Sequence, residues 1–237
     1  MGNRQITPHS RNANMTESKL PRIAILGGTG KEGKGLARRW AKAGYAVIIG
    51  SRTPEKARAA AGEINALLKR GSVSADDNLS AARAGEIVVL AVPYVAHRET
   101  LEAVKAMVQG KLVIDVTVPL VPPRVSRVQM PSAGSAAMEA REILGDGVQI
   151  VDAFQNVSHE HLLGSVDVDC DVLVTGSSME ARTRALDLVA AAGLVGWDAG
   201  PIENSVVVEG LTSVLIYINK HYGSTHAGIR ITGVQQL

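Results

Sequence analysis

Short apolar runs alternate with longer amphipathic segments along most of the chain. The apolar runs have the length of buried strands and cover residues 22–26, 45–49, 86–94 and 111–120. The segments between them have helical spacing and cover residues 34–44, 54–70 and 97–109. Apolar strands that alternate with helices are typical of a parallel sheet covered on both faces. We therefore predict an α/β fold with a Rossmann-like parallel sheet.

The alternation continues beyond a proline-rich loop that follows Val118. We expect strands at 148–154, 171–176 and 195–200, helices at 136–144 and 179–193, and a long helical segment at 204–223. The predicted domains are a disordered N-terminal tail at 1–20, a Rossmann domain at 21–154, and a smaller, mostly helical C-terminal part at 155–237.

Composition narrows the class of protein. The chain has 237 residues, a formal net charge of +2 and 3% aromatic residues, which argues against a nucleic-acid surface. The N-terminal tail lacks the apolar stretch of a secretory signal, and no apolar run has the length of a membrane span. The single cysteine, Cys170, cannot form an internal disulfide. We therefore expect a globular protein of the reducing cytoplasm with no nucleic-acid or membrane partner.

The stretch AILGGTGKEGKG, residues 24–35, matches two phosphate-binding motifs. Gly28, Gly30 and Gly33 form the G-x-G-x-x-G of a dinucleotide fold, and the same stretch also contains the G-x-x-x-x-G-K of a triphosphate loop. A triphosphate loop needs a hydroxyl after its lysine to hold magnesium, but Lys34 is followed by glycine. A dinucleotide loop needs a strand before the glycines and a helix after them, and both are predicted here. This favours the dinucleotide motif.

The three glycines of this motif have separate expected roles. Gly28 permits a tight turn, Gly30 lets a pyrophosphate approach the backbone, and Gly33 lets the helix pack closely on the strand.

The start of the following helix is expected to face the phosphates through Thr29 and the backbone amides of Lys31 and Glu32. A carboxylate at this end suits the helix dipole but repels an anionic cofactor. We therefore expect the side chain of Glu32 to point away from the cofactor.

The end of the second strand predicts which nucleotide is bound. A fold that binds NAD usually places a carboxylate there, about 20 residues beyond the glycines, to bind the adenine ribose. This chain has Ser51, Arg52 and Lys56 instead. Their hydroxyl and cationic groups would bind a 2′-phosphate, which a carboxylate would repel. We predict NADP as the cofactor; the alternative is that Arg52 and Lys56 are solvated residues at a helix entrance.

Several stretches together resemble the NADPH-dependent coenzyme F420 reductases, also called F420:NADP oxidoreductases. These stretches are ILGGTGKEGKGLARRWAKAGYAVIIGSR at 25–52, AVPY at 91–94, NSVVVEGLTSVLIYIN at 204–219 and AGIRITG at 227–233. The likeness runs from about residue 22 to residue 233. The glycine loop alone is a weak signal, whereas its combination with GSR and the closing GIRITG is much more specific.

This resemblance implies an oxidoreductase that exchanges a hydride directly between NADP(H) and a deazaflavin, coenzyme F420. It implies that the two cofactors stack in a cleft between the Rossmann domain and the C-terminal part, and that the protein is a homodimer. Such a transfer requires positioning rather than acid–base chemistry, so we expect neither a catalytic residue nor a metal.

The predicted cofactor-binding residues follow from the glycine loop and from this resemblance. Those for NADP are Gly28, Thr29, Gly30, Lys31, Glu32, Gly33, Ser51, Arg52 and Lys56. Those beside the nicotinamide are Val92, Pro93, Tyr94, Val118 and Pro119. Those for the deazaflavin are Gln155, Asn156, Val157, His159, Ala227 and Gly228.

One position departs from the family pattern. Family members commonly have a histidine where this chain has Gln155 followed by Asn156. Both amides can hydrogen-bond a ring carbonyl, but neither can become cationic. This departure concerns the site of the hydride acceptor and leaves the NADP site unchanged.

The nearby histidines suggest a metal site only weakly. His159 and His161 would need a third ligand, and the sequence marks none, so we expect them beside a cofactor pocket. We interpret His97 as a side chain at the entrance of a helix.

Two other functions stay open on the same fold. The first is an NADPH-dependent reductase of another acceptor, such as a flavin or an imine. The second is a non-catalytic NADP-sensing protein, although such a sensor would not need the patterned C-terminal part.

Overall fold

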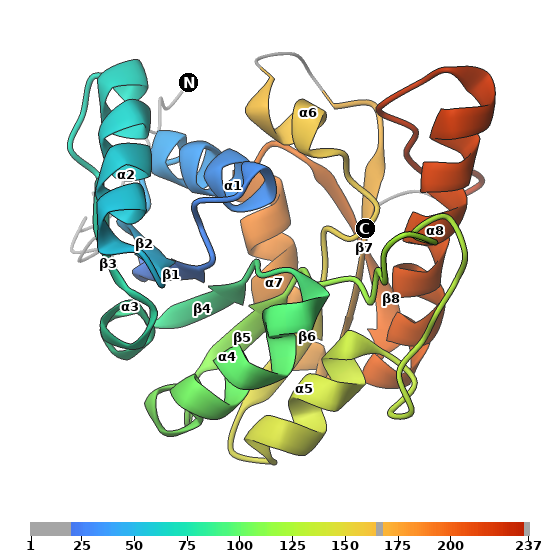
Figure 1. The fold of residues 1–237 in the computed structure, drawn as a ribbon, viewed down its shortest axis with the longest axis horizontal. Coiled ribbons are helices and arrows are strands. Elements are labelled where there is room, and N and C mark those ends of the chain that lie inside the picture. Colours follow the sequence, from blue (N-terminus) through green and yellow to red (C-terminus); the bar gives the residue numbers. More distant parts are fainter. Residues whose placement is uncertain (1–19, 165–167, 235–237) are drawn as a thin grey trace, which may run out of the picture.

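A single sheet organises the molecule. The computed structural model describes residues 20–164 and 168–234. Within these residues, eight strands form one sheet in the order β3-β2-β1-β4-β5-β6-β7-β8 (Figure 1). Neighbouring strands are parallel except for β6 and β7, which are antiparallel. The predicted Rossmann-like α/β fold is confirmed. The predicted disordered tail, 1–20, lies outside the described residues except for Leu20.

The strands are short and mostly apolar. They are β1 (Ile23–Leu26), β2 (Val47–Ser51), β3 (Val73–Asp77), β4 (Ile87–Leu90), β5 (Leu112–Asp115), β6 (Gln149–Asp152), β7 (Asp171–Gly176) and β8 (Val195–Pro201).

The connections between strands are mainly α-helices. They are α1 (Lys31–Lys42), α2 (Pro54–Leu68), α3 (Asn78–Ala84), α4 (His97–Val104), α5 (Ala136–Leu144), α6 (His159–Leu163), α7 (Met179–Ala191) and α8 (Ser205–Tyr222). Short 3-10 helices lie at Tyr94–Ala96, Lys105–Met107 and Ile202–Asn204. No helix in the described part of the chain is long and apolar enough to cross a membrane.

A hydrophobic core lies on each face of the sheet. Helices α1, α2 and α7 contribute to one core, and α3, α4 and α5 contribute to the other. In the first core, Trp40 of α1 is fully buried and its indole N–H donates to the carbonyl of Leu188 in α7 at 2.8 Å. Its ring also meets Phe154 edge-on, with centroids 5.8 Å apart. Trp40 thereby fixes α1 and α7 against the segment that follows β6.

The sequence pattern missed one strand and two helices. Strand β3 and helix α3 lie between 70 and 86, and helix α6 lies between 154 and 171, where no strand or helix was predicted. β3 is an edge strand in which Val73 alone is buried, so it has no continuous apolar run. The predicted boundary near Phe154 stays a prediction; β6 and β7, which lie on its two sides, pair within the same sheet.

Helix α6 packs closely on α1. A Cβ atom at Gly35 would lie 2.5 Å from the Cβ of Leu162, so only glycine fits there. The guanidinium of Arg39 donates to the carbonyls of His161, Leu162 and Ala192 at 2.8, 3.1 and 2.6 Å. Packing against α6 therefore accounts for the glycine that follows Lys34, the position where a triphosphate loop has a hydroxyl.

Helix α8 is anchored far back in the chain, at the start of α5. The carboxylate of Glu209 accepts hydrogen bonds from the backbone N–H groups of Ala136 and Ala137 at 2.7 and 3.0 Å. The hydroxyls of Ser135 and Ser205 lie 2.6 Å apart. These contacts are buried and hold α8 beside the sheet, where it can form one wall of a cavity.

Candidate functional site

The turn after β1 contains both Gly27 and Gly28, and glycine is needed at each position for a different reason. Gly27 has φ +73°, and a Cβ atom there would lie 2.7 Å from the carbonyl oxygen of Ala91. Gly28 does not have a positive φ; a Cβ atom there would lie 2.8 Å from the carbonyl oxygen of Ile25. Gly28 lies within the turn, where its N–H donates to the carbonyl of Ile25 at 3.2 Å, and its predicted role stays a prediction. Close packing against β1 is the reason for glycine at this position.

The remaining two glycines have the surroundings that we expected. A Cβ atom at Gly33 would lie 2.7 Å from the Cα of Gly28, which shows how closely α1 approaches the loop. A Cβ atom at Gly30 would meet only the carbonyl oxygen of Gly27, at 3.6 Å. Gly30 is also the N-cap of α1 and supplies no side-chain acceptor, so the first backbone amides of the helix are available to an anion.

A cavity of about 440 Å³ extends from this loop to the end of β2. Arg52 and Lys56 line it, and neither forms an ion pair with another residue in the described ranges. Ser51 is 7% exposed, and its hydroxyl accepts from the N–H of Thr53 at 3.1 Å. The full lining is Gly27, Thr29, Gly30, Lys31, Glu32, Ser51, Arg52, Thr53, Lys56, Asn78, Ala91, Val92, Pro93, Ala96 and Thr100. We name this space the loop cavity.

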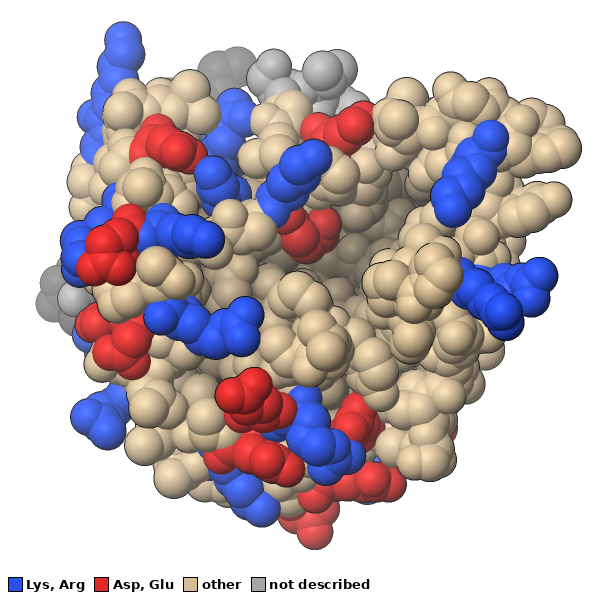
Figure 2. Space-filling model, in the orientation of Figure 1, with Lys and Arg blue, Asp and Glu red and all other residues tan. Residues whose placement is uncertain are grey.

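A second cavity, of about 610 Å³, lies between the carboxyl ends of the central strands and α8. Its lining includes Glu32, Val92, Pro93, Tyr94, Val116, Thr117, Val118, Leu120, Pro122, Val125, Phe154, Gln155, Asn156, Val157, Ser158, His159, Thr212, Leu215, Ile216, Asn219, Thr225 and Ala227. Figure 2 shows the molecular face to be hollowed between the regions of α6 and α8, with few charged side chains in the hollow. We name this space the acceptor cavity.

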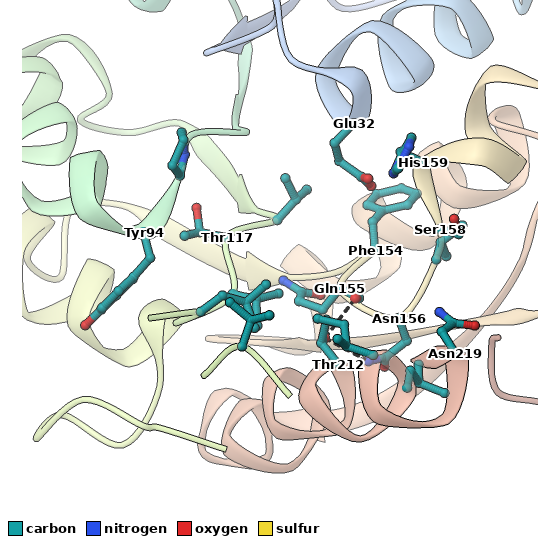
Figure 3. Close-up of a pocket in the computed structure, with 18 of the residues that line it drawn as sticks. Glu32, Tyr94, Thr117, Phe154, Gln155, Asn156, Ser158, His159, Thr212 and Asn219 are labelled. Atoms are coloured by element: carbon teal, nitrogen blue, oxygen red, sulfur yellow. Dashed lines mark hydrogen bonds between the residues drawn. The ribbon is translucent and has the colours of Figure 1, made fainter. Parts of the chain in front are cut away.

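The two cavities meet at three residues. Glu32 from α1 and Val92 and Pro93 from the loop after β4 line both of them. Figure 3 shows the side chain of Glu32 extending from α1 toward Phe154 in the acceptor cavity. We expected the side chain of Glu32 to point away from the cofactor. The side chain stands at the junction of the two cavities, and its orientation relative to a bound cofactor stays a prediction.

The environment of Glu32 favours its neutral form. Its carboxyl oxygen Oε1 is buried and has no hydrogen-bond partner among the described residues. Burial raises the pKa of Glu32 to about 8.

Gln155 reaches the acceptor cavity after an unusual backbone turn. Phe154, which precedes it, has φ 77°, a backbone conformation that residues other than glycine rarely adopt. The side-chain amide of Gln155 donates to the carbonyl of Asp115 at 2.7 Å and also to the carboxyl of Asp152. A backbone carbonyl can only accept, so this contact fixes which end of the amide is the nitrogen. The oxygen Oε1 is left buried and without a partner in the described structure.

Gln155 contacts a buried group of ionisable side chains. Asp152 is fully buried; burial and the negative charges of Glu209 and Asp115 raise its pKa well above the usual range. Burial also raises the pKa of Glu209 to about 8, although its bonds to the amides of α5 oppose the shift. Two buried acids that repel each other hold a proton more readily than isolated ones. We therefore expect Asp152 and Glu209 to share a proton near neutral pH.

His97 belongs to the same buried group rather than to the cavity lining. Its Nε2 lies 2.7 Å from Asp115 Oδ2, and both side chains are fully buried. Burial lowers the pKa of His97, but the charge and hydrogen bond of Asp115 together with the charges of Glu139 and Glu209 outweigh this, so the net shift is upward. His97 is the first residue of α4, as our interpretation of it as a helix-entry side chain required.

The structure brings most of the predicted site residues to the two cavities. Exceptions are Pro119, which is buried outside both linings, and Gly228, where a Cβ atom would lie 2.5 Å from that of Cys170. Gly28 and Gly33 shape the loop without lining it.

The sequence reasoning missed other lining residues, and some of them carried a recognisable signal. They include Gly27, Asn78, Thr100, Thr117, Thr212 and Asn219. Thr212 and Asn219 are spaced at i and i+7, which places polar groups on one face of an otherwise apolar helix. Asn78 had no such signal, because it belongs to α3, a helix that we did not predict; its side-chain oxygen accepts from the N–H of Gly27 at 3.4 Å.

Two histidines near α6 contact each other, and a third lines the acceptor cavity. His161 and His226 stack edge-to-face at 5.3 Å, and His159 lines the acceptor cavity. In the described residues, no group of three or more His, Cys, Asp or Glu side chains is placed to hold a metal ion.

Taken together, the loop and the cations at the end of β2 define a dinucleotide-binding protein of the Rossmann type, with a second ligand cavity beside the first. A family model for NADP oxidoreductase, coenzyme F420-dependent, matches residues 22–119.

Relatives over the whole chain identify the family. The chain is 39% identical to the F420-dependent NADP reductase of Methanocaldococcus jannaschii, across 90% of this chain and 99% of that protein. It is 38% identical to the F420-dependent NADP reductase of Methanothermobacter marburgensis, across 91% of this chain and 100% of that protein. The chain therefore belongs to the F420-dependent NADP reductase family.

A solved structure shares the fold. A candidate F420-dependent NADP reductase from Arthrobacter sp. FB24 superposes with a TM-score of 0.74 at 22% identity, across 89% of this chain and 99% of that one. At this identity the likeness concerns the fold alone.

Proposed function

We propose that this protein exchanges a hydride directly between NADP(H) and coenzyme F420. The observation that carries the proposal is the junction of the loop cavity and the acceptor cavity at Glu32, Val92 and Pro93. One ligand in each cavity would meet the other there without a protein group between them. Relatives named F420-dependent NADP reductases, at 36 to 39% identity, favour a deazaflavin over the flavin and imine alternatives and over a sensor.

The loop cavity fits the phosphates of NADP. The open backbone at Gly30 and the uncapped start of α1 suit a pyrophosphate, because amide N–H groups and the helix dipole favour an anion. Arg52 and Lys56, which have no ionic partner in the described residues, suit the 2′-phosphate. No carboxylate lines the end of β2 on the described wall of this cavity, so nothing there would repel that group.

The acceptor cavity fits a planar ring with polar edges. Apolar side chains such as Val92, Val116 and Leu215 provide contact area, and Gln155 provides an unpartnered oxygen. That oxygen can only accept a hydrogen bond, so it would recognise an N–H group on the ring. Thr212 on α8 is already bonded to the backbone carbonyl of Gln155 at 2.8 Å, which holds this loop against the helix.

The protein's part in the reaction is positioning and exclusion of water. When both are bound, the nicotinamide and deazaflavin rings supply the hydride donor and the hydride acceptor. Val92 and Pro93 form the surface shared by both cavities and set how closely two ligands can approach. A transfer between ring carbons needs an approach of roughly 3–3.5 Å. The apolar walls keep water from the junction, which protects the transfer from side reactions.

The direct test is turnover with purified protein, NADPH and either F420 or flavin mononucleotide as the acceptor, followed by the absorbance of each acceptor. We expect reduction of F420 and none, or far less, of the flavin. Equal rates would favour a general flavin reductase. Tight NADPH binding without turnover of either acceptor would favour an NADP-sensing protein.

Replacing Gln155 tests the acceptor cavity. Gln155→Ala should weaken F420 binding by a factor of about 3 to 10, as expected for one hydrogen bond of about 0.5–1.5 kcal/mol. Gln155→His should introduce a group that titrates near pH 6.5, with faster reduction of F420 below that pH because an imidazolium stabilises developing negative charge. Single-turnover rates as a function of pH measure both effects.

A matched control exists at the start of the strand that leads to Gln155. Gln149 opens β6 and is bonded to Arg184, remote from both cavities, so Gln149→Ala should leave binding unchanged. Identical pH profiles and affinities for wild type and both Gln155 variants would place residue 155 outside the acceptor contact.

We also propose that the protein forms a homodimer through α8. Val207, Val214 and Tyr217 are 62%, 45% and 57% exposed, and together they make an apolar strip on this helix. Exposed apolar strips of this kind are typical of subunit interfaces.

A cytoplasmic location fits the single buried cysteine, Cys170.

Sedimentation at micromolar concentration tests the dimer. We expect wild type to sediment as a dimer and Val214→Lys to shift the equilibrium toward monomer. Val95→Lys is the control, because Val95 is 93% exposed and lies outside α8. A wild-type monomer would contradict the proposal.

A further inference from the structure

Glu32 is an unusual residue at the place where the two cavities meet. Among the described residues that line the acceptor cavity, it is the only Asp, Glu, Lys or Arg. Its oxygen Oε1 is buried and unpartnered, and the side chain reaches from the phosphate-binding end of α1 into the acceptor cavity (Figure 3). A carboxylate here would face the phosphates of one ligand and the charge that a hydride brings to the other.

We propose that Glu32 sets the charge at this junction: it takes up a proton when NADP(H) binds and then presents a neutral carboxyl to the acceptor cavity. The inference rests on the proposed NADP(H) site. It adds to that site a residue whose protonation is coupled to nucleotide binding.

Two effects raise the pKa of Glu32 in the complex. Burial alone already raises the pKa of Glu32 to about 8. The negative charge of a bound pyrophosphate lies at the same helix end and disfavours the carboxylate further, so the pKa rises again in the complex. A group whose pKa is higher in the complex binds protons as the complex forms, at pH values between the two pKa values. Proton uptake should therefore be clearest at pH 8.5.

Other charged and titratable groups share these cavities and must be separated from Glu32. They are Lys31 on α1, Arg52 and Lys56 at the start of α2, Tyr94 after β4, and His159 on α6. Tyr94 is bonded to Glu139 and, mainly through burial, has a pKa raised to about 12, above the range in question. The other groups are unchanged in a Glu32 variant, so the difference from wild type isolates Glu32.

The experiment is calorimetric titration of NADPH into protein at pH 8.5 in buffers of different ionisation enthalpy, which counts the protons taken up. We expect wild type to take up about half a proton or more beyond Glu32→Gln. We also expect NADPH affinity in wild type to fall as pH rises above 8, while that of Glu32→Gln stays flat. The experiment needs no acceptor. Failure of NADPH to bind would contradict the proposed function, whereas binding with equal proton uptake in wild type and Glu32→Gln would contradict only this inference.

A matched control and a second measurement complete the test. Glu55 has the same place in α2 as Glu32 has in α1, the second helical residue, but its side chain is 73% exposed and ion-paired with Arg58 at 2.7 Å. Glu55→Gln should take up as many protons as wild type. Infrared difference spectra of wild type with NADPH should gain the carbonyl stretch of a protonated carboxyl, even if Glu32→Gln folds poorly. Absence of that band at pH 8.5 would overturn the proposal.

Discussion

Replacing both Arg52 and Lys56 by alanine is expected to raise the Kd for NADPH by a factor of about 100. Each side chain lines the loop cavity and is free of ionic partners in the described structure. A hydrogen bond to a charged group contributes about 1.5 kcal/mol or more, so two of them account for about 3 kcal/mol. The Kd for NADH should change less than about threefold, because NADH lacks the 2′-phosphate.

The measurement is a titration with NADPH and NADH at one fixed ionic strength, since salt screens these charges. The control is Arg58→Ala combined with Lys69→Ala, which removes the same charge near the same helix but from outside the cavity. Equal losses of affinity for NADPH and NADH would show that Arg52 and Lys56 do not contact the 2′-phosphate.

The buried acids predict a second large effect, on stability. Glu209 has a pKa of about 8 in the folded protein against an ordinary value of 4.5, and the pKa of Asp152 is raised as well. The folded state therefore holds protons that the unfolded state releases between pH 4.5 and 8, so the free energy of unfolding falls as pH rises through this window. His97, whose pKa is also raised, acts in the same direction.

Asp152→Asn tests this effect. The asparagine keeps the shape and removes the like charge next to Glu209, so the loss of stability between pH 5 and 8.5 should shrink by a few kcal/mol, at about 1.4 kcal/mol for each pKa unit relieved. Urea unfolding at the two pH values gives the free energies. Asp169→Asn serves as the control, because that side chain is 82% exposed. A pH dependence equal to that of wild type would contradict a shared proton between Asp152 and Glu209.

The sequence predicted the parts of the molecule whose constraints are local. The apolar runs of β1, β4 and β5 lie in the centre of the sheet and are buried on both faces, so their composition alone identifies them. Strand β3 lies at the edge of the sheet, where polar side chains can face solvent. Its sequence therefore has no continuous apolar run that would identify it as a strand. The cations at 52 and 56 could be predicted because the fold fixes where a 2′-phosphate must lie.

The features of the site that the sequence did not predict depend on contacts between distant segments. Glu32 lines the junction in a cavity that it shares with Phe154 and His159, which belong to distant segments, and nothing within the glycine loop indicates that. The turn at Gly27 is required by the carbonyl of Ala91, sixty-odd residues away. The orientation of the Gln155 amide likewise depends on Asp115 and Asp152.

The anchoring of α8 has a consequence for how the chain acquires its activity during synthesis. The bonds from Glu209 to Ala136 and Ala137 span 73 and 72 residues, and Thr212 joins Gln155 across 57. A ribosome releases β1 to β6, with the whole lining of the loop cavity, before any of α8 emerges. The nascent chain can thus form the loop cavity first, and the acceptor cavity is completed only when α8 docks. A chain truncated before α8 would therefore retain the loop cavity but lack one wall of the acceptor cavity.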